Sequence, residues 1–132
     1  MKSGDTFLMP APGISIRTPH LWIVVTDPPE ENHMVVIVSI TTLRHGAEQT
    51  VVLRKGEHPF IDRDSSVCYA DARIVDVRDL EARAKAGHVK THAPCPPKTL
   101  EIIADGILAS ELTPRKVQKF YESLPKRKIQ TE

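Results

Sequence analysis

The chain has 132 residues, of which 40% are hydrophobic and 27% charged, a composition typical of one soluble globular domain rather than a disordered or membrane chain. Eighteen basic residues against seventeen acidic ones leave a formal net charge of +1, which excludes the global basic field of a nucleic-acid coat protein. Any site for a polyanion must therefore be local.

Five segments rich in β-branched and apolar residues predict strands, separated by proline, glycine or polar turns. They are Thr6–Met9, His20–Thr26, His33–Thr42, Thr50–Leu53 and a final strand or strand pair over Ser66–Val77. The second, third and fourth segments follow one another closely along the chain, so we expect them to form a meander.

Beyond Val77 the spacing of apolar residues changes to that of short helices. Asp79 is the predicted N-cap of a helix over Leu80–Ala86, and Gly87 is its predicted C′ residue. Residues 87–97, rich in His, Pro and Cys, are predicted to form a loop.

Two more helices are predicted after that loop. Thr99 caps the first, which runs to Ala109, and Thr113 with Pro114 supplies the cap and first position of the second, which stops at Pro125. Their apolar stripes are Leu100, Ile103, Ile107 and Leu108 in the first, and Val117, Phe120, Tyr121 and Leu124 in the second. We interpret both stripes as core-facing, with a groove for a partner as the alternative.

This order of elements predicts a mainly β (β+α) fold, a compact barrel or sheet with short C-terminal helices. The core occupies residues 1–78, and residues 79–132 form a helical flank of the same domain. Residues 111–132 hold six Lys or Arg and three Glu, a local charge of +3.

Neither a membrane span of about 18 apolar residues nor the apolar stretch of a signal peptide is found, so we expect a cytoplasmic protein without membrane partners. Cys68 lies in an apolar strand and Cys95 between prolines, which favours reduced thiols, although a bridge remains open.

His88, His92 and Cys95 are metal-ligand residue types, but they lie in a proline-rich segment without a Cys-x-x-Cys pair. We interpret this segment as a surface loop and expect no metal and no other cofactor. The chain also lacks a glycine-rich phosphate loop and a Gly-x-Ser-x-Gly element, which excludes the enzyme classes that depend on them.

The stretch SSVCYADARIVDV, residues 65–77, contains a carboxylate near the middle of a predicted core strand, Asp71. Two interpretations are open. Asp71 either caps a bulge or pairs with Arg73 or Arg17 at the rim of the barrel, or it takes part in catalysis.

Five motifs follow in order: GDTFLMPAPG, IRTPHLWIVVTD, VVIVSITT, VVL and SSVCYADARIVDV. This order resembles the MazF and PemK (Kid) family of toxin endoribonucleases. That family opens with a Gly-Asp strand start, continues with an Arg-x-Pro element and an apolar strand ending in Ile-Thr-Ser or Ile-Thr-Thr, and closes with a strand that carries an acid. The matching positions, within roughly residues 4–78, are Gly4, Asp5, Arg17, Pro19, Ile40, Thr41, Thr42 and Asp71.

The resemblance implies an SH3-like β-barrel, often a homodimer, that cuts single-stranded RNA without a metal and is inhibited by an antitoxin protein. In such a reaction a ribose 2′-OH attacks its own phosphate, which requires proton transfer and a cation at phosphorus. The implied catalytic residues are Arg17 at the phosphate, Thr41 or Thr42 as hydrogen-bond donor, and Asp71 as the acid.

Four further residues are expected to contact substrate. His20 or His58 could donate a proton at neutral pH. Where the PemK branch has an arginine two residues before the acid, this chain has Tyr69, and Arg73 is the expected substitute on the same strand face. Because that arginine is replaced, the alternative is a non-catalytic barrel acting as a protein-interaction module; a third option is a nucleic-acid binder using the basic tail.

Overall fold

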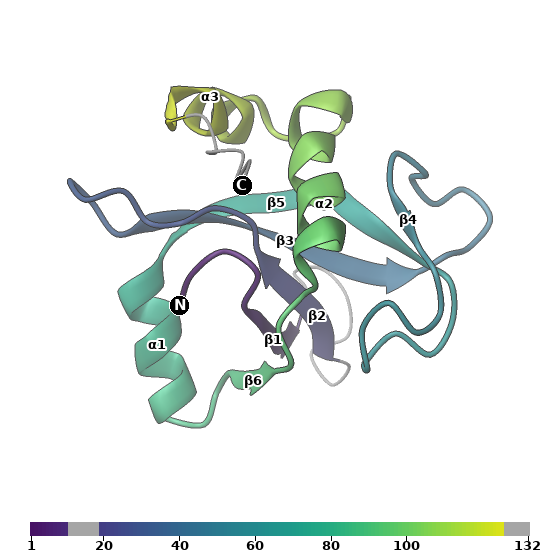
Figure 1. The fold of residues 1–132 in the computed structure, drawn as a ribbon, viewed down its shortest axis with the longest axis horizontal. Helices are drawn as coiled ribbons and strands as arrows, with labels where there is room; N and C mark the ends of the chain where they lie inside the picture. Colours follow the sequence, from purple (N-terminus) through teal and green to yellow (C-terminus); the bar gives the residue numbers. More distant parts are fainter. Residues whose placement is uncertain (11–18, 126–132) are drawn as a thin grey trace, which may run out of the picture.

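The computed structural model describes residues 1–10 and 19–125, and in this part of the chain the predicted mainly β fold class is confirmed (Figure 1). Antiparallel strands form one six-stranded sheet that curls into a half-barrel, accompanied by three short helices. The elements are β1 (Thr6–Pro10), β2 (Pro19–Val24), β3 (Met34–Thr42), β4 (Val52–Leu53), β5 (Ser65–Asp76), α1 (Val77–Lys85), β6 (Lys90–His92), α2 (Pro97–Ala109) and α3 (Arg115–Ser123). None of the described helices is both long and apolar enough to cross a membrane.

The strand order is β4-β5-β3-β2-β1-β6, which corrects two expectations. The predicted meander is wrong at β4, because the long strand β5 lies between β3 and β4. The predicted loop over 87–97 contains β6, which pairs with β1. The strand predicted over Thr50–Leu53 is found as β4, and only its pairing partner differs. The three residues of β6 have no local strand signal, because they form a strand only where β1 supplies their backbone partners.

The two faces of the sheet bury different cores. Figure 1 shows α2 and α3 together on one side and α1 apart from them near β1 and β6. Ile103, Ile107 and Val117 pack on the first face with residues such as Leu21, Val38 and Tyr69. Leu80 of α1 packs on the second face with Phe7, Trp22, Val24, Val35 and Ile37. Continuous apolar strands such as MVVIVSI are therefore explained by burial on both faces.

Strand β5 runs directly into α1, and Asp76 rather than Asp79 is the N-cap. The Asp76 carboxylate accepts a hydrogen bond from Arg78 N at 2.8 Å and pairs with the Arg78 side chain at 2.7 Å, and these bonds lower the pKa of Asp76 to about 2. Gly87 is the C′ residue as predicted, at φ +83°, and bonds from Gly87 N to Ala84 O and from His88 N to Arg83 O close the helix.

The predicted caps of the other two helices are each displaced by a proline. Pro96 is the N-cap of α2, and Thr99 lies inside the first turn, buried. Pro114 is the N-cap of α3, while the buried Thr113 Oγ1 has no hydrogen-bond partner among the described residues. The α2 stripe also differs, because Ala104 is buried and Leu108 is 46% exposed.

Helix α2 approaches β5 so closely that one helix position has no room for a side chain. A Cβ at Gly106 would lie 1.9 Å from the Tyr69 hydroxyl oxygen and 2.3 Å from Tyr69 Cζ. The Tyr69 ring is fully buried, and its hydroxyl donates to Ile103 O at 2.7 Å. Gly106 therefore provides the notch that receives Tyr69, which explains a glycine in the middle of this helix.

Candidate functional site: a polar stripe on the α1 face of the sheet

Polar side chains interrupt the second face of the sheet beyond the apolar core under α1. Along β3 the residues alternate, so Ser39 and Thr41 share the face of Val35 and Ile37. The register places Ser39 between Trp22 and Cys68, and Thr41 opposite Ser66. We call this set the polar stripe; its members are His20, Ser39, Thr41, Ser66, Cys68, Asp71 and Arg73.

Asp71 joins the stripe through a large bulge. Ile37 pairs with Arg73 but Ser39 pairs with Cys68, so residues 69–72 of β5 lie opposite Val38 alone. The half-buried Asp71 carboxylate accepts from Ser39 Oγ at 3.5 Å and from Cys68 Sγ at 3.4 Å. The bulge agrees with the structural interpretation of Asp71, and the partial exposure of the residue is compatible with the catalytic one.

Arg73 lies on the same sheet face as Asp71, stacked on a tryptophan. Its guanidinium carbon lies 5.2 Å from the centre of the Trp22 ring, a cation–π arrangement. The Asp71–Arg73 ion pair, one of the alternatives offered by the sequence, is absent among the described residues, where Arg73 stacks on Trp22. Trp22 is fully buried and its Nε1 donates to Met9 O at 3.0 Å, so the platform under Arg73 is fixed.

One end of the stripe opens into a pocket of about 360 Å³ that contains three of the predicted site residues, His20, Thr41 and Thr42. Arg44 and Arg63 also line it. His20 Nδ1 lies 3.3 Å from Ile40 O, while its buried Nε2 atom has no partner in the described part of the chain. The pocket thus combines hydroxyls, guanidinium groups and an imidazole with one carboxylate, Asp62, which pairs with Arg63 at 3.4 Å. The hydroxyls and guanidinium groups suit a phosphate.

The structure does not bring the remaining predicted residues to the stripe. Tyr69 lies on the opposite face under α2, and burial raises the pKa of its hydroxyl. His58 is 4% exposed, and its Nε2 is bonded to Ala93 O in the connection after β6. Arg17 lies outside the described residues; it precedes Pro19, which lines the pocket, by two positions.

Several residues of this site could hardly be predicted from the sequence. Ser39 is the single polar residue inside the run VVIVSI, and that exception was its only signal. Arg44 and Arg63 lie in turns, where charged residues are ordinary. Trp22 and Cys68 looked like core residues, and only the strand register shows that they flank Ser39.

Cys68 is a protonated thiol at neutral pH. Burial, followed by the neighbouring Asp71 carboxylate, raises the pKa of Cys68 to about 11. Both Cys68 and Cys95 are free cysteines. Among residues 1–10 and 19–125, no group of three or more His, Cys, Asp and Glu side chains is arranged to hold a metal ion.

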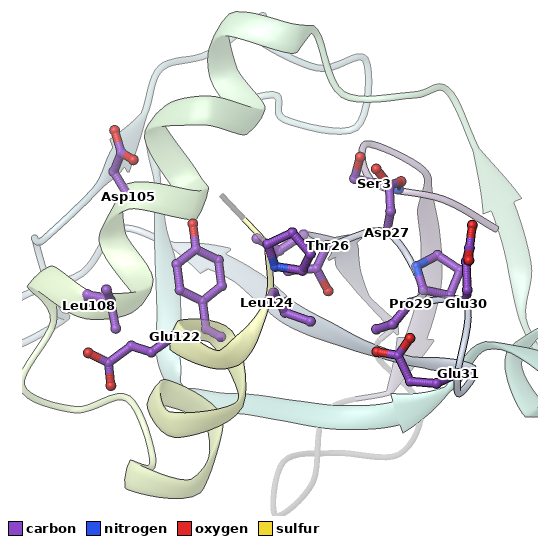
Figure 2. Close-up of a pocket in the computed structure, with 14 residues that line it drawn as sticks. Ser3, Thr26, Asp27, Pro29, Glu30, Glu31, Asp105, Leu108, Glu122 and Leu124 are labelled. Carbon is purple, nitrogen blue, oxygen red and sulfur yellow. Dashed lines mark hydrogen bonds between the residues drawn. The ribbon is translucent and has the colours of Figure 1, made fainter. Parts of the chain in front are cut away.

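A larger cleft of about 1120 Å³ lies elsewhere, between the β2–β3 connection and helices α2 and α3. Figure 2 shows Asp105 and Glu122 on one side of it and Asp27, Glu30 and Glu31 on the other. No Lys or Arg of the described chain lines this cleft. Because five carboxylates would repel a phosphodiester chain, this cleft is unsuitable for RNA despite its size.

The hydrogen bonds of His58 can be tested by measuring how the free energy of unfolding depends on pH. Its Nε2 lies 2.6 Å from Ala93 O and its Nδ1 accepts from Phe60 N at 3.0 Å, an arrangement that requires the neutral ring. Burial, opposed by the Ala93 bond and assisted by His92, lowers the pKa of His58 below 6.5. The unfolded state therefore binds the proton first as the pH falls.

We expect the His58 contribution to be complete above pH 6.5 and to decrease as the pH falls toward the lowered pKa of the folded state. A His58→Gln variant, whose amide can still donate to Ala93 O, should show a smaller loss of stability across this range in urea unfolding. His88→Gln, at an exposed position, should retain the wild-type dependence. Identical pH profiles for wild type and His58→Gln would contradict the assignment.

No protein-family model matches the chain, and a search of curated proteins finds no relative. The function must therefore be argued from the residues and their arrangement.

Proposed function

We propose that the protein is a metal-independent endoribonuclease of the toxin-antitoxin type, which binds single-stranded RNA along the polar stripe and its end pocket. The observation that carries the proposal is that His20 and Thr41, which line the pocket, share a sheet face with Ser39 and its partner Asp71. Thr41 and Ser39 are neighbours on that face, a step of about 7 Å along a strand. This is roughly the spacing of successive phosphates along a nucleic-acid strand.

The reaction needs proton transfer, binding of the phosphate oxygens and stabilisation of the charge on phosphorus. We assign these functions to residues of the stripe, its end pocket and Arg17. Asp71 takes the proton of the attacking 2′-OH, and His20 protonates the leaving 5′-oxygen, a step that requires its buried Nε2 to become accessible when RNA binds. Hydroxyls of Thr41 and Thr42 hold phosphate oxygens. The role of Arg17 comes from the resemblance: its guanidinium stabilises the charge that develops on phosphorus.

Neither α2 nor α3 covers the stripe, because both helices bury their apolar residues on the opposite sheet face. Ser39 and Ser66 are only 1% exposed, so RNA would contact the partly exposed members His20, Thr41, Cys68, Asp71 and Arg73. Arg73 over Trp22 and Arg44 at the pocket add cationic groups along this face. A local basic site of this kind suits a chain whose net charge is only +1.

Incubation of the purified protein with mixed-sequence RNA in EDTA tests the proposal. Wild type should produce fragments ending in a 2′,3′-cyclic phosphate, and Arg17→Ala should lower the cleavage rate by about 100-fold, because a cation at phosphorus contributes a few kcal/mol. Arg17→Lys, which keeps the charge but not the bidentate geometry, should fall between them. Intact RNA with wild-type protein, or equal rates for all three, would remove the proposal.

A second candidate is a non-catalytic interaction module on the same fold. Tyr69 favours it. The position at which the PemK branch has an arginine is here a tyrosine buried on the opposite face, so it provides no cation to the stripe. An antitoxin partner and a homodimer, both implied by the resemblance, are compatible with either function. The EDTA experiment separates the two candidates, since the module would leave RNA intact.

A further inference from the structure

The bulge that carries Asp71 needs hydrogen-bond partners other than the neighbouring strand β3. Residues 69–72 have no paired residues on β3, so their backbone groups must find other partners. The contacts of Asp71 itself hold the bulge only weakly, because the bond from Ser39 Oγ is long, at 3.5 Å, and the Cys68 thiol, at 3.4 Å, is a weak donor. Something else must fix where this carboxylate lies.

Glu48 supplies that support from the connection between β3 and β4. Its Oε1 accepts from Tyr69 N, the first amide of the bulge, at 3.2 Å. Its Oε2 accepts from Thr50 Oγ1 at 2.7 Å and from Ser110 Oγ. Ser110 is the C-cap of α2, and its hydroxyl also accepts from Leu112 N at 3.1 Å. One half-buried carboxylate therefore joins the bulge, its own loop and the end of α2.

The same residue restrains the other side of the site. Arg44 lines the end pocket and lies four positions before Glu48, with a turn closed by the bond from Ala47 N to Arg44 O at 2.9 Å. Anchoring Glu48 therefore limits the movement of the loop that presents Arg44. No other described carboxylate bonds to both the bulge and α2.

We propose that Glu48 is a positioning residue for the polar stripe, which holds the Asp71 bulge and the Arg44 loop in place from the opposite side of the sheet. This inference rests on the proposed nuclease function for its catalytic consequence only. The positioning itself concerns the folded protein and can be measured without RNA.

Cys68 reports the position of Asp71, because its thiol donates to that carboxylate and its pKa is raised to about 11 partly by it. Alkylation of each cysteine can be followed by peptide mass mapping, with Cys95 as an internal reference for general loosening. We expect Glu48→Ala to increase the Cys68 rate by about tenfold and to leave Cys95 unchanged. Glu48→Gln, which keeps an acceptor for Tyr69 N, should stay close to wild type.

Glu57→Ala is the matched control. Glu57 is also a half-buried loop carboxylate that reaches α2, through Thr99 Oγ1 at 3.5 Å, but it does not touch the bulge. The Glu57→Ala variant should leave the alkylation rate of Cys68 unchanged. The Glu57 carboxylate itself lies close enough to Cys95 to raise the pKa of that thiol. Equal acceleration of both cysteines in Glu48→Ala, or no acceleration of Cys68, would overturn the inference.

If wild type cleaves RNA, Glu48→Ala should lower kcat by about 10- to 100-fold with little change in KM, the expected result of misplacing a reacting group. A KM effect with unchanged kcat would contradict positioning of Asp71. If wild type does not cleave RNA, the nuclease proposal fails, while the Cys68 measurement still decides whether Glu48 holds the bulge.

Discussion

Gly106→Ala is expected to destabilise the protein by about 3 kcal/mol, although glycine to alanine inside a helix normally stabilises by about 1 kcal/mol. The added Cβ would lie 1.9 Å from the hydroxyl oxygen of Tyr69. The Tyr69 ring cannot swing away, because it is fully buried and its hydroxyl is bonded to Ile103 O. Either α2 must move off β5 or Tyr69 must leave its site.

Urea unfolding of a double-mutant cycle checks this explanation. Tyr69→Leu alone should also destabilise, because it leaves a cavity and unpairs Ile103 O, but the two changes together should cost less than their sum. Asp105→Ala is the control on the same helix, since Asp105 is exposed, and its effect should stay within about 0.5 kcal/mol. Additive losses in the double variant would show that the Tyr69 contact is not the cause.

Asp71→Asn is expected to lower RNA cleavage by about 100-fold or more, the usual effect of removing a general base. The amide keeps the shape of the side chain and can still accept from Ser39 Oγ, so stability should change little. KM should also change little, because Arg44 and the threonine hydroxyls of the pocket remain in place.

Steady-state kinetics with a short single-stranded RNA measure this prediction. Asp62→Asn is the matched control, because Asp62 lines the end pocket but is exposed and paired with Arg63 at 3.4 Å. Wild-type rates in Asp71→Asn, or an equal loss in Asp62→Asn, would contradict a catalytic role for Asp71. A loss of folding in Asp71→Asn would instead indicate the structural role of a bulge residue.

The sequence predicted the fold class because its strongest signals are local. The β3 run is so apolar and β-branched that no other element suits it, and Gly87 ends α1 by a conformation that glycine favours. The predicted N-cap positions of α2 and α3 were wrong by three residues and one residue, because Pro96 and Pro114 are the N-caps rather than Thr99 and Thr113.

The site was harder to predict because it depends on register. In a regular strand Tyr69, Asp71 and Arg73 would share one face, and Asp71 and Arg73 do lie on the stripe face. The bulge turns Tyr69 to the other face, where Gly106 receives it. A three-residue shift of pairing leaves no local pattern, so neither this burial nor the role of Glu48 could be read from spacing.

The pairing of β6 with β1 has a consequence for synthesis of the chain. The first strand has its outer neighbour only after residue 92 has been made, and Cys95 N bonds back to Gly4 O at 2.7 Å. The core over Tyr69 closes later still, with α2. Contacts so far apart along the chain cannot form until both segments exist. A nascent chain that has not yet exposed residues 90–109 should therefore have an incomplete sheet and core, so any activity against RNA would begin only once these residues have left the ribosome.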